Sequence, residues 1–330
     1  MGQSRSVSAR RVLMVAMLAG LLALPTVTRQ AHSAETALSC TPLDESQAPG
    51  SAEEWLARSR LASHCYSFQA RAVRIGAAGV RTLALSHEVR EGRVREVARL
   101  LDGPPGVHER QGSIAYSDSG GGARATPAAV ESLSSLYRLS LAGEERIAGR
   151  STHVLEIEPL DNLRYGRRLW LDAETALPLK QILLDERGRA LETFQVTKLQ
   201  NPRLYSGDIK ARSPSVSGEH VWQPGWLPSG FEPQAVSADA SQGQQRYGDG
   251  LSTLSLFVEP ISGQPLLKPG LHRLGVSHAA VRHLEVDGEP HQLVILGELP
   301  PSVLQRVAES VEWQSEPTTA SATPDDSVSP

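Results

Sequence analysis

Four side chains that could bind a metal ion lie within nine residues of one another: His283, Glu285, Asp287 and His291. Imidazole and carboxylate groups are ordinary zinc ligands, but a site needs them to converge on one point. Asp287-Gly288 is typical of a hairpin turn, and across a hairpin with a two- or four-residue loop His283 and His291 fall on opposite faces. The first three residues are more simply the solvated face of a strand whose other face carries Leu284 and Val286. The pattern therefore predicts no metal site.

Signatures of covalent and phosphate chemistry are missing. The chain has no Gly-x-Ser-x-Gly elbow, and its two cysteines could not form a structural zinc site alone. Gly120-Gly121-Gly122 is not followed by the Lys-Ser/Thr of a phosphate loop. The acidic pairs Glu144-Glu145 and Asp325-Asp326 stand in a turn and a tail, where solvation explains them. We predict no catalytic residue, no cofactor and no enzyme, although a catalytic site assembled from distant residues remains the weakest alternative.

Cys40 and Cys65 are the two cysteines of the chain. Outside the cytosol such a pair tends to be oxidised, and the bridge would close a loop worth roughly 3–4 kcal/mol in the chain-entropy model. The alternative is two free thiols, one of them in a loose N-terminal arm. The compartment favours the disulfide.

Export is predicted by the first 34 residues. Three arginines precede thirteen apolar or small residues, residues 12–24, and small residues follow at 31–34. This is typical of a secretory signal peptide and too short for a membrane span. Cys40 lies too far from the apolar run for a lipoprotein cleavage box. Cleavage after Ala34 would remove four arginines and no acids, so the formal net charge would fall from −4 to −8. An acidic surface of this kind disfavours nucleic acid as a partner.

The secondary-structure elements predicted to position these residues are one helix followed by many strands. Ser51 and Glu54 form a capping-box pattern ahead of a helix at residues 51–62. Alternation predicts strands at residues 66–72, 81–88, 93–100, 137–142, 144–147, 152–159, 164–172, 178–185 and 190–199, with a short helix at 126–136. Strands joined by short turns, without helical crossovers, predict an antiparallel sheet.

A second, smaller unit follows a stretch rich in proline, glycine and serine. In this unit the sequence pattern predicts strands at residues 244–247, 252–258, 281–286 and 291–297, and a helix at 301–311. We expect the following organisation: signal peptide 1–34, N-terminal arm 35–50, large domain 51–205, linker 206–225, small domain 226–313 and disordered tail 314–330.

Several segments together resemble the MucB/RseB family. In the large domain they are Leu101–Pro105, Tyr137–Leu139, Gly143–Arg150, Tyr165–Asp172 and Leu183–Gly188; in the small domain they are Trp226–Phe231, Ser252–Pro260 and Val303–Val311. The resemblance runs in order from about Ser51 to Trp313, and no single block would suffice. The first hairpin lacks the usual aromatic-rich strand after Phe68, which puts the identity of a ligand in doubt more than the fold.

The resemblance implies an α+β fold, with a half-open antiparallel β-barrel that holds helices in its mouth, similar to lipoprotein carriers. It also implies a smaller antiparallel sheet domain with one helix. Members bind the periplasmic segment of a single-span anti-sigma factor and shield it from regulated proteolysis, and lipid or lipopolysaccharide signals release it. A periplasmic lipid or lipoprotein carrier is the alternative, although a simple carrier would need only the barrel. A homodimer is left open.

Candidate contact residues divide into two groups. Partner contacts are expected at Trp170, Trp222, Trp226 and Phe231, because Trp222 and Trp226 flank Pro224 near the expected domain junction. A lipid groove is expected at Phe68, Trp170, Ile182 and Phe194. On strand alternation Trp170 shares a face with Arg168 and not with Leu169 or Leu171, which leans toward a groove. Ordinary packing is the alternative for all three tryptophans.

Overall fold

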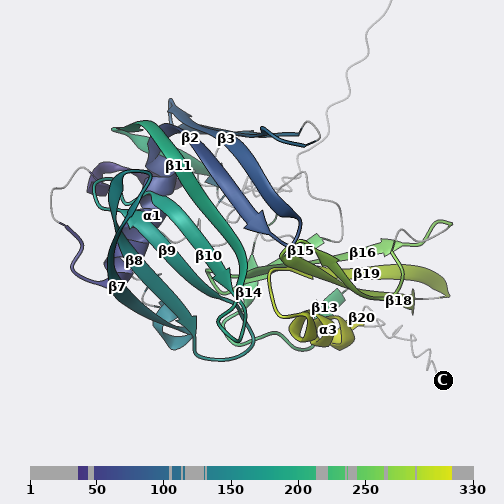
Figure 1. Ribbon diagram of the computed structural model, residues 1–330. Coiled ribbons are helices and arrows are strands. Elements are labelled where there is room, and N and C mark those ends of the chain that lie inside the picture. The colour runs from purple at the N-terminus through teal and green to yellow at the C-terminus, as the bar shows by residue number, and fades with distance from the viewer. Residues whose placement is uncertain are drawn as a thin grey trace, which may run out of the picture. The chain divides into compact units, whose positions relative to one another are not determined.

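The computed structural model describes residues 36–43, 48–103, 106–112, 114–115, 130, 132–212, 222–234, 236, 244–263, 267–286 and 288–313 (Figure 1). All of them belong to one compact unit, Ser33–Pro330. The predicted signal peptide, the loop at 120–122 and the C-terminal tail lie outside the described residues. So do residues 126–129 and 131 of the helix expected at 126–136, of which Ser132–Ser135 forms the short helix η2. Within the described ranges no helix is long and apolar enough to cross a bilayer.

Helix α1, Ala52–Cys65, begins where the capping box predicted. The Ser51 hydroxyl accepts a hydrogen bond from the Glu54 amide at 3.2 Å, and the Glu54 carboxylate accepts one from the Gly50 amide at 2.6 Å. The first bond satisfies an amide that the first helical turn leaves unpaired, and the second ties the helix to the residue before its N-cap. One face of α1 buries Trp55, Leu56 and Leu61 in the core of the large domain.

The described part of the large domain is dominated by a nine-stranded sheet in which every neighbouring pair is antiparallel, as predicted. Its strands are β2 (Tyr66–Gly76), β3 (Gly79–Arg90), β4 (Arg93–Leu100), β5 (Val107–Gly112), β7 (Tyr137–Ile147), β8 (Arg150–Pro159), β9 (Gly166–Asp172), β10 (Pro178–Leu184) and β11 (Ala190–Leu204). The order is β5-β4-β3-β2-β11-β10-β9-β8-β7. Because β5 and β7 stand at opposite edges, the sheet is open along one side, which agrees with a half-open barrel.

The two faces of this sheet differ in what they carry. Cross-strand partners place Leu155, Leu169 and Phe194 on one face, the inner face, against which α1 packs through Trp55 and His153, ring centroids 4.3 Å apart. The opposite, outer face carries the alternate residues of each strand.

Strand β7 corrects one prediction. Two strands were expected at 137–142 and 144–147, and the structure has one strand with a shift of register between Leu141 and Glu144. Gly143, with φ of 114°, takes the backbone conformation that this bulge needs.

A three-stranded sheet joins both ends of the large domain. Strand β12 (Asp208–Arg212) pairs antiparallel with β1 (Thr36–Ser39) and parallel with β6 (Ile114–Ala115), and the 3-10 helix η1, Thr41–Leu43, follows β1. The expected linker at 206–225 therefore begins too early, because its first part is a strand. Local periodicity is too short there to reveal a pairing between residues so distant in sequence.

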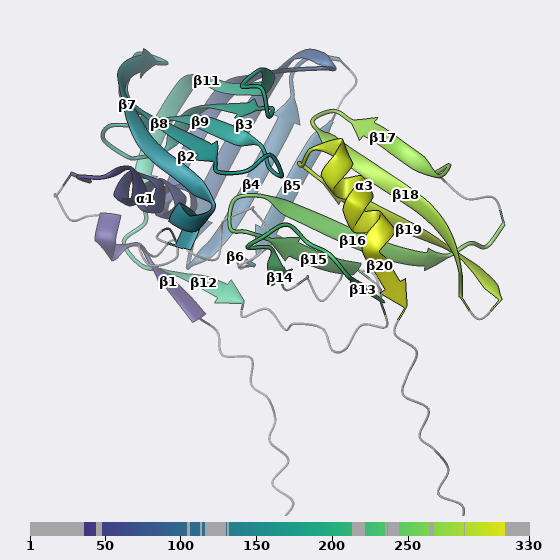
Figure 2. The same cartoon turned by 90° about the horizontal axis from the view of Figure 1, so that it is seen from below.

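The small domain is an antiparallel sheet of six described strands with one helix across it (Figure 2). Its strands, in the order β14-β15-β16-β19-β18-β17, are β14 (Glu232–Gln234), β15 (Gln244–Gly248), β16 (Thr253–Pro260), β19 (Glu289–Gly297), β18 (Ser277–Val286) and β17 (Gly270–Leu274). Helix α3, Pro301–Ser310, begins with proline at its first position and buries Val303, Leu304 and Val307. A two-stranded ribbon, β13 (Trp222–Pro224) with β20 (Val311–Trp313), completes the domain.

Candidate functional site

An apolar cavity of about 380 Å³ opens on the inner face of the large sheet. Most of its wall is aliphatic or aromatic, with a few polar side chains: Ser63, Phe68, Leu85, Ser86, His87, Glu96, Val97, Ala98, Leu177, Pro178, Leu179, Phe194, Val196 and Leu199. Two of the predicted groove residues, Phe68 and Phe194, are among them. Strands β2, β3, β4, β10 and β11 supply the wall because their inward residues are apolar, and α1 contributes its last turn through Ser63.

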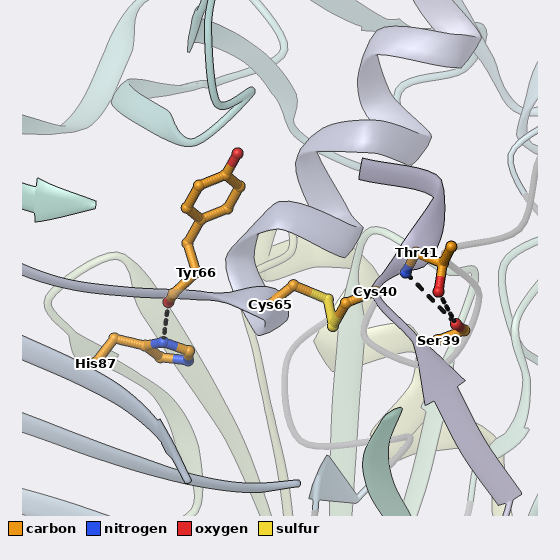
Figure 3. Close-up of a disulfide and its surroundings, with 6 residues drawn as sticks. All are labelled: Ser39, Cys40, Thr41, Cys65, Tyr66 and His87. Atoms are coloured by element: carbon orange, nitrogen blue, oxygen red, sulfur yellow. Dashed lines mark hydrogen bonds between the residues drawn. A yellow bond between two sulfur atoms is a disulfide. The ribbon is translucent and has the colours of Figure 1, made fainter. Parts of the chain in front are cut away.

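A histidine and a carboxylate interrupt this apolar wall. The His87 Nδ1 lies 2.6 Å from the Tyr66 carbonyl oxygen (Figure 3). Because a carbonyl can only accept, Nδ1 carries the proton. The other ring nitrogen, Nε2, faces the Glu96 carboxylate at 3.5 Å, and the ring stacks on Phe68 at a centroid distance of 5.4 Å. The cavity is thus a place for an apolar chain with one polar position.

The disulfide lies beside this wall (Figure 3). Cys40, just after β1, is bonded to Cys65, the last residue of α1, with their Cα atoms 5.7 Å apart. Both cysteines are buried, and Tyr66, which holds the His87 ring, is the next residue along the chain. The bridge therefore fixes the N-terminal arm to the end of α1 at the point where the chain enters the cavity wall.

Trp170 and Ile182 do not line the cavity, which corrects the groove prediction for both. Trp170 is opposite Lys180 across the sheet, and Ile182 is opposite Thr193, whereas the cavity residue Phe194 points to the other face. Trp170 is only 3% exposed, because the Lys180 ammonium lies over its ring at 4.2 Å and its indole N–H donates to Glu145 at 2.9 Å. The alternation that paired Trp170 with Arg168 was right; that face is the outer one.

The two domains meet at a buried ion cluster. The Arg164 guanidinium, 0% exposed, donates to Asp249 at 2.6 Å, to both oxygens of Asp161 at 3.0 and 3.1 Å, and to the Ser229 carbonyl at 2.8 Å. The Tyr137 hydroxyl also donates to Asp249, at 2.8 Å. Asp161, Arg164 and Tyr137 belong to the large domain; Ser229 and Asp249 belong to the small one.

Aromatic rings and two further arginines enclose this cluster. Arg164 lies 5.5 Å from the centroid of the Tyr137 ring and 5.7 Å from that of Phe231. Arg60 of α1 donates to the Gly250 carbonyl at 2.9 Å, and Arg167 of β9 donates to the Leu251 carbonyl at 3.1 Å. Burial, and then the nearby Arg167, lower the pKa of Arg60 to about 10, while burial followed by Asp249 raises the pKa of Tyr137. The cluster thus connects the two domains through buried polar contacts.

The other predicted partner residues lie mainly in the small domain. Trp222 is buried and packs edge-on against Trp313 at 4.5 Å, so it stabilises the ribbon of β13 and β20 and offers little surface. Phe231 is buried beside Arg164 at the domain contact. Trp226 is half-buried and carries the Arg306 guanidinium over its ring at 3.8 Å. Of these three, Trp226 offers a partner the most surface.

The histidine-rich hairpin does not form a ligand set among the described residues. His283 pairs with Gln292 and Leu284 pairs with His291, so the two histidines point to opposite faces as the sequence predicted. Asp287 lies outside the described residues. In the part of the chain that the structure describes, no three histidine, cysteine or acidic side chains come together as a metal site would require.

Sequence reasoning missed His87 with Glu96 and Arg164 with Asp249. His87 and Glu96 each stand at an inward position of an alternating strand, and a charged residue at such a position was the available signal. Asp161 and Arg164 follow a strand three residues apart, which is common in loops, and Asp249 lies 85 residues further on. Nothing local marks that contact.

Comparison with known proteins matches both domains. A family model described as the MucB/RseB N-terminal domain matches residues 51–213, and one described as the MucB/RseB C-terminal domain matches residues 216–312. The Sigma factor AlgU regulatory protein MucB of Pseudomonas aeruginosa is 33% identical over 292 residues, which cover 79% of this chain and 90% of that protein. The Sigma-E factor regulatory protein RseB of Escherichia coli K12 is 27% identical over 293 residues, 78% and 89% of the two chains.

Solved structures agree. The chain is similar to MucB in the Pseudomonas aeruginosa MucA/MucB complex, with a TM-score of 0.62, 30% identity and coverage of 80% of this chain and 99% of that one. It is similar also to MucB crystallised in complex with MucA(peri), with a TM-score of 0.61, 30% identity and coverage of 80% and 100%.

Proposed function

The chain belongs to the MucB/RseB family, and from this we propose that it is a periplasmic regulator that binds the periplasmic segment of a membrane anti-sigma factor and protects it from regulated proteolysis. The observation that carries the proposal is the match along both domains to MucB, a protein solved in complex with MucA. Members of the family are regulatory binding proteins.

We place the partner on a surface that both domains share. The buried Arg164–Asp249 pair joins them, so surfaces on either side are presented to a partner in a fixed relation. Pre-organisation of this kind lowers the entropy that binding must overcome. Trp226 with Arg306 is the candidate contact on the small domain, since an aromatic ring under a guanidinium offers both apolar area and hydrogen-bond donors.

The experiment is calorimetric titration of the mature protein with the periplasmic segment of its cognate anti-sigma factor. We expect saturable binding, and slower proteolysis of the segment when the protein is present. Trp226→Ala should weaken binding by about 2 kcal/mol, roughly thirtyfold. Trp313→Ala is the control, because Trp313 is the more exposed of the two but packs on Trp222 instead. Absence of binding by the intact protein would refute the proposal.

A second activity, release of the partner by a lipid or lipopolysaccharide, is favoured by the cavity itself. Its apolar wall and its volume of about 380 Å³ suit an acyl chain, and His87 with Glu96 supplies one polar position. The test is titration with a fluorescent fatty acid, followed by competition with lipid A. Phe194→Asp should abolish saturable binding at micromolar protein, whereas Ile182→Asp, on the other face, should leave it unchanged. If both variants bind like the wild type, the cavity is ordinary core.

A further inference from the structure

A row of cations crosses the outer face of the large sheet. Lys198 of β11 is opposite Arg71 of β2, Arg71 is opposite Ala84 of β3, and Ala84 is opposite Arg99 of β4. The three cations are exposed. Since neighbouring strands lie about 4.8 Å apart, the row spans roughly 14 Å with small Ala84 between two arginines. We call Lys198, Arg71 and Arg99 the basic row.

An apolar row lies on the same face, at the tip of the β2–β3 hairpin. Ile182, Thr193, Ile75 and Val80 are successive cross-strand partners on β10, β11, β2 and β3. Ile75 is 47% exposed and Val80 is 60% exposed, and the turn between them consists only of glycine and alanine. Ile75 and Arg71 are four residues apart on one strand, so the apolar tip lies about 13 Å from the basic row.

The charges around these rows favour an anionic partner. Arg74 and Arg81 form the cross-strand pair next to the tip, on its other side. Of the acids nearby, Glu88 is paired with Arg90 at 2.6 Å and Glu192 lies 3.6 Å from Arg74, while Glu109 is opposite Val97 by register. Arg74 and Arg81 share the inner face with Phe194, so the cations of the outer face that count here are the three of the basic row, in a chain whose formal net charge is −4.

We propose that this face is a docking surface for an anionic phospholipid membrane, with the hairpin tip entering the headgroup layer and the basic row lying on the phosphates. An aliphatic tip enters the boundary between headgroups and acyl chains, about 5–10 Å deep, and cations behind it are attracted by anionic lipid. An acidic protein segment would account for the basic row but would leave the two exposed aliphatic residues Ile75 and Val80 at the β2–β3 turn without a role.

The contact is weak and reversible, because it consists of two aliphatic side chains and a few cations, fewer than stable anchoring requires. It concerns where the protein resides and does not depend on the partner that it holds. Its strength falls with ionic strength, since these cations are solvent-exposed.

The experiment is co-sedimentation of the mature protein with vesicles of phosphatidylcholine alone and with 30 mol% phosphatidylglycerol, at low salt and in 0.5 M NaCl. We expect binding to the anionic vesicles at low salt only. Each cation removed from the basic row should weaken it about fivefold, so Arg71→Gln/Arg99→Gln/Lys198→Gln should abolish it in the measured range. Ile75→Asn/Val80→Asn should weaken it as well.

Matched controls come from other parts of the chain. Leu271→Asn/Leu274→Asn alters two aliphatic residues of β17 with similar exposure, 45% and 53%, and Arg146→Gln removes an exposed charge on β7. Both should bind vesicles like the wild type, and thermal melting verifies that every variant is folded. Equal binding to both vesicle types, or full binding by the triple variant, would overturn the proposal. So would failure to bind vesicles together with retention on polyglutamate that needs the basic row, which would identify an acidic protein as the partner.

Discussion

Arg164 is a charged side chain without exposed surface, and its environment explains how the fold tolerates it. Two carboxylates neutralise the guanidinium, a carbonyl accepts from it, and Tyr137 and Phe231 lie near it on the large and small domains. A buried ion pair adds little net stability over an apolar replacement, but removal of one partner leaves the other charge buried and unpaired. Loss of Arg164 would therefore act mainly by leaving the Asp249 carboxylate buried without a cation.

We therefore expect Arg164→Met to lower the free energy of unfolding by about 3–5 kcal/mol, because Asp249 would stay buried without its cation. Arg164→Met/Asp249→Leu should recover part of that loss. Urea denaturation followed by tryptophan fluorescence measures both, with the exposed Arg138→Met as control, expected within about 0.5 kcal/mol of wild type. A loss below 1 kcal/mol for the single variant would mean that water reaches Asp249.

At the scale of elements, the β10–β11 turn shows how one carboxylate can define a connection. Asp185 Oδ1 accepts from the Arg187 and Arg189 amides at 2.9 and 2.8 Å, and its Oδ2 accepts from the Arg189 guanidinium at 2.7 Å. Burial alone would raise the pKa of Asp185, but the hydrogen bonds from Arg189 and then Arg187 outweigh it and hold the pKa below the ordinary value. The turn is therefore stabilised by the ionised form.

Because the folded pKa of Asp185 is lowered, its contribution is present above the unfolded pKa of about 4 and is lost as the pH falls through the folded value. Asp185→Asn should cost about 1–2 kcal/mol at pH 7. The difference from wild type should shrink below pH 4, as urea titrations at pH 7 and pH 3 would show. A difference that stays constant with pH would assign the effect to turn geometry and not to charge.

The disulfide fixes the N-terminal arm to helix α1 and should stabilise the folded protein. The bridge between Cys40 and Cys65 spans 25 residues of sequence, and the chain-entropy model gives a stabilisation of about 3–4 kcal/mol for such a loop. Cys40→Ala/Cys65→Ala should lower the free energy of unfolding by that amount, measured in urea against the oxidised protein. The reduced wild type should show a similar loss; a smaller one would mean that the arm stays paired without the bridge.

Elements with local signals could be predicted from sequence, and those made by distant pairing could not. The cap at Ser51 and the alternation in β9 are readable because a few neighbouring residues determine them. Strands β1 and β12 were missed because each is short and its partner is more than 160 residues away. The same limit applies to the site. Phe68 and Phe194 line the cavity. Strand alternation gives the face that Trp170 shares with Arg168, but it does not tell that the cavity opens on the opposite face of the sheet.

At the scale of the whole molecule, the described residues form two hydrophobic cores that share a polar contact. Leu251 of the small domain packs into the core of the large one, beside the arginines that bind its loop. Such a contact couples the two cores, so unfolding of either domain exposes the ion cluster to water. We expect one cooperative transition for the intact protein in differential scanning calorimetry, and separation into two in Arg164→Met. Two transitions in the wild type would show that the domains unfold independently.

The pairing of β1 with β12 has a consequence for how the large sheet relates to the rest of the chain. Thr36 lies opposite Ala211, so the backbone arrives at this domain and departs from it at a single place. A domain whose two ends lie close together tolerates circular permutation or insertion into another protein, because a short linker can join those ends on the surface. A linker joining residue 212 to residue 36, with new ends opened in the Gly76–Gly79 turn, should thus preserve the strand order of the large sheet.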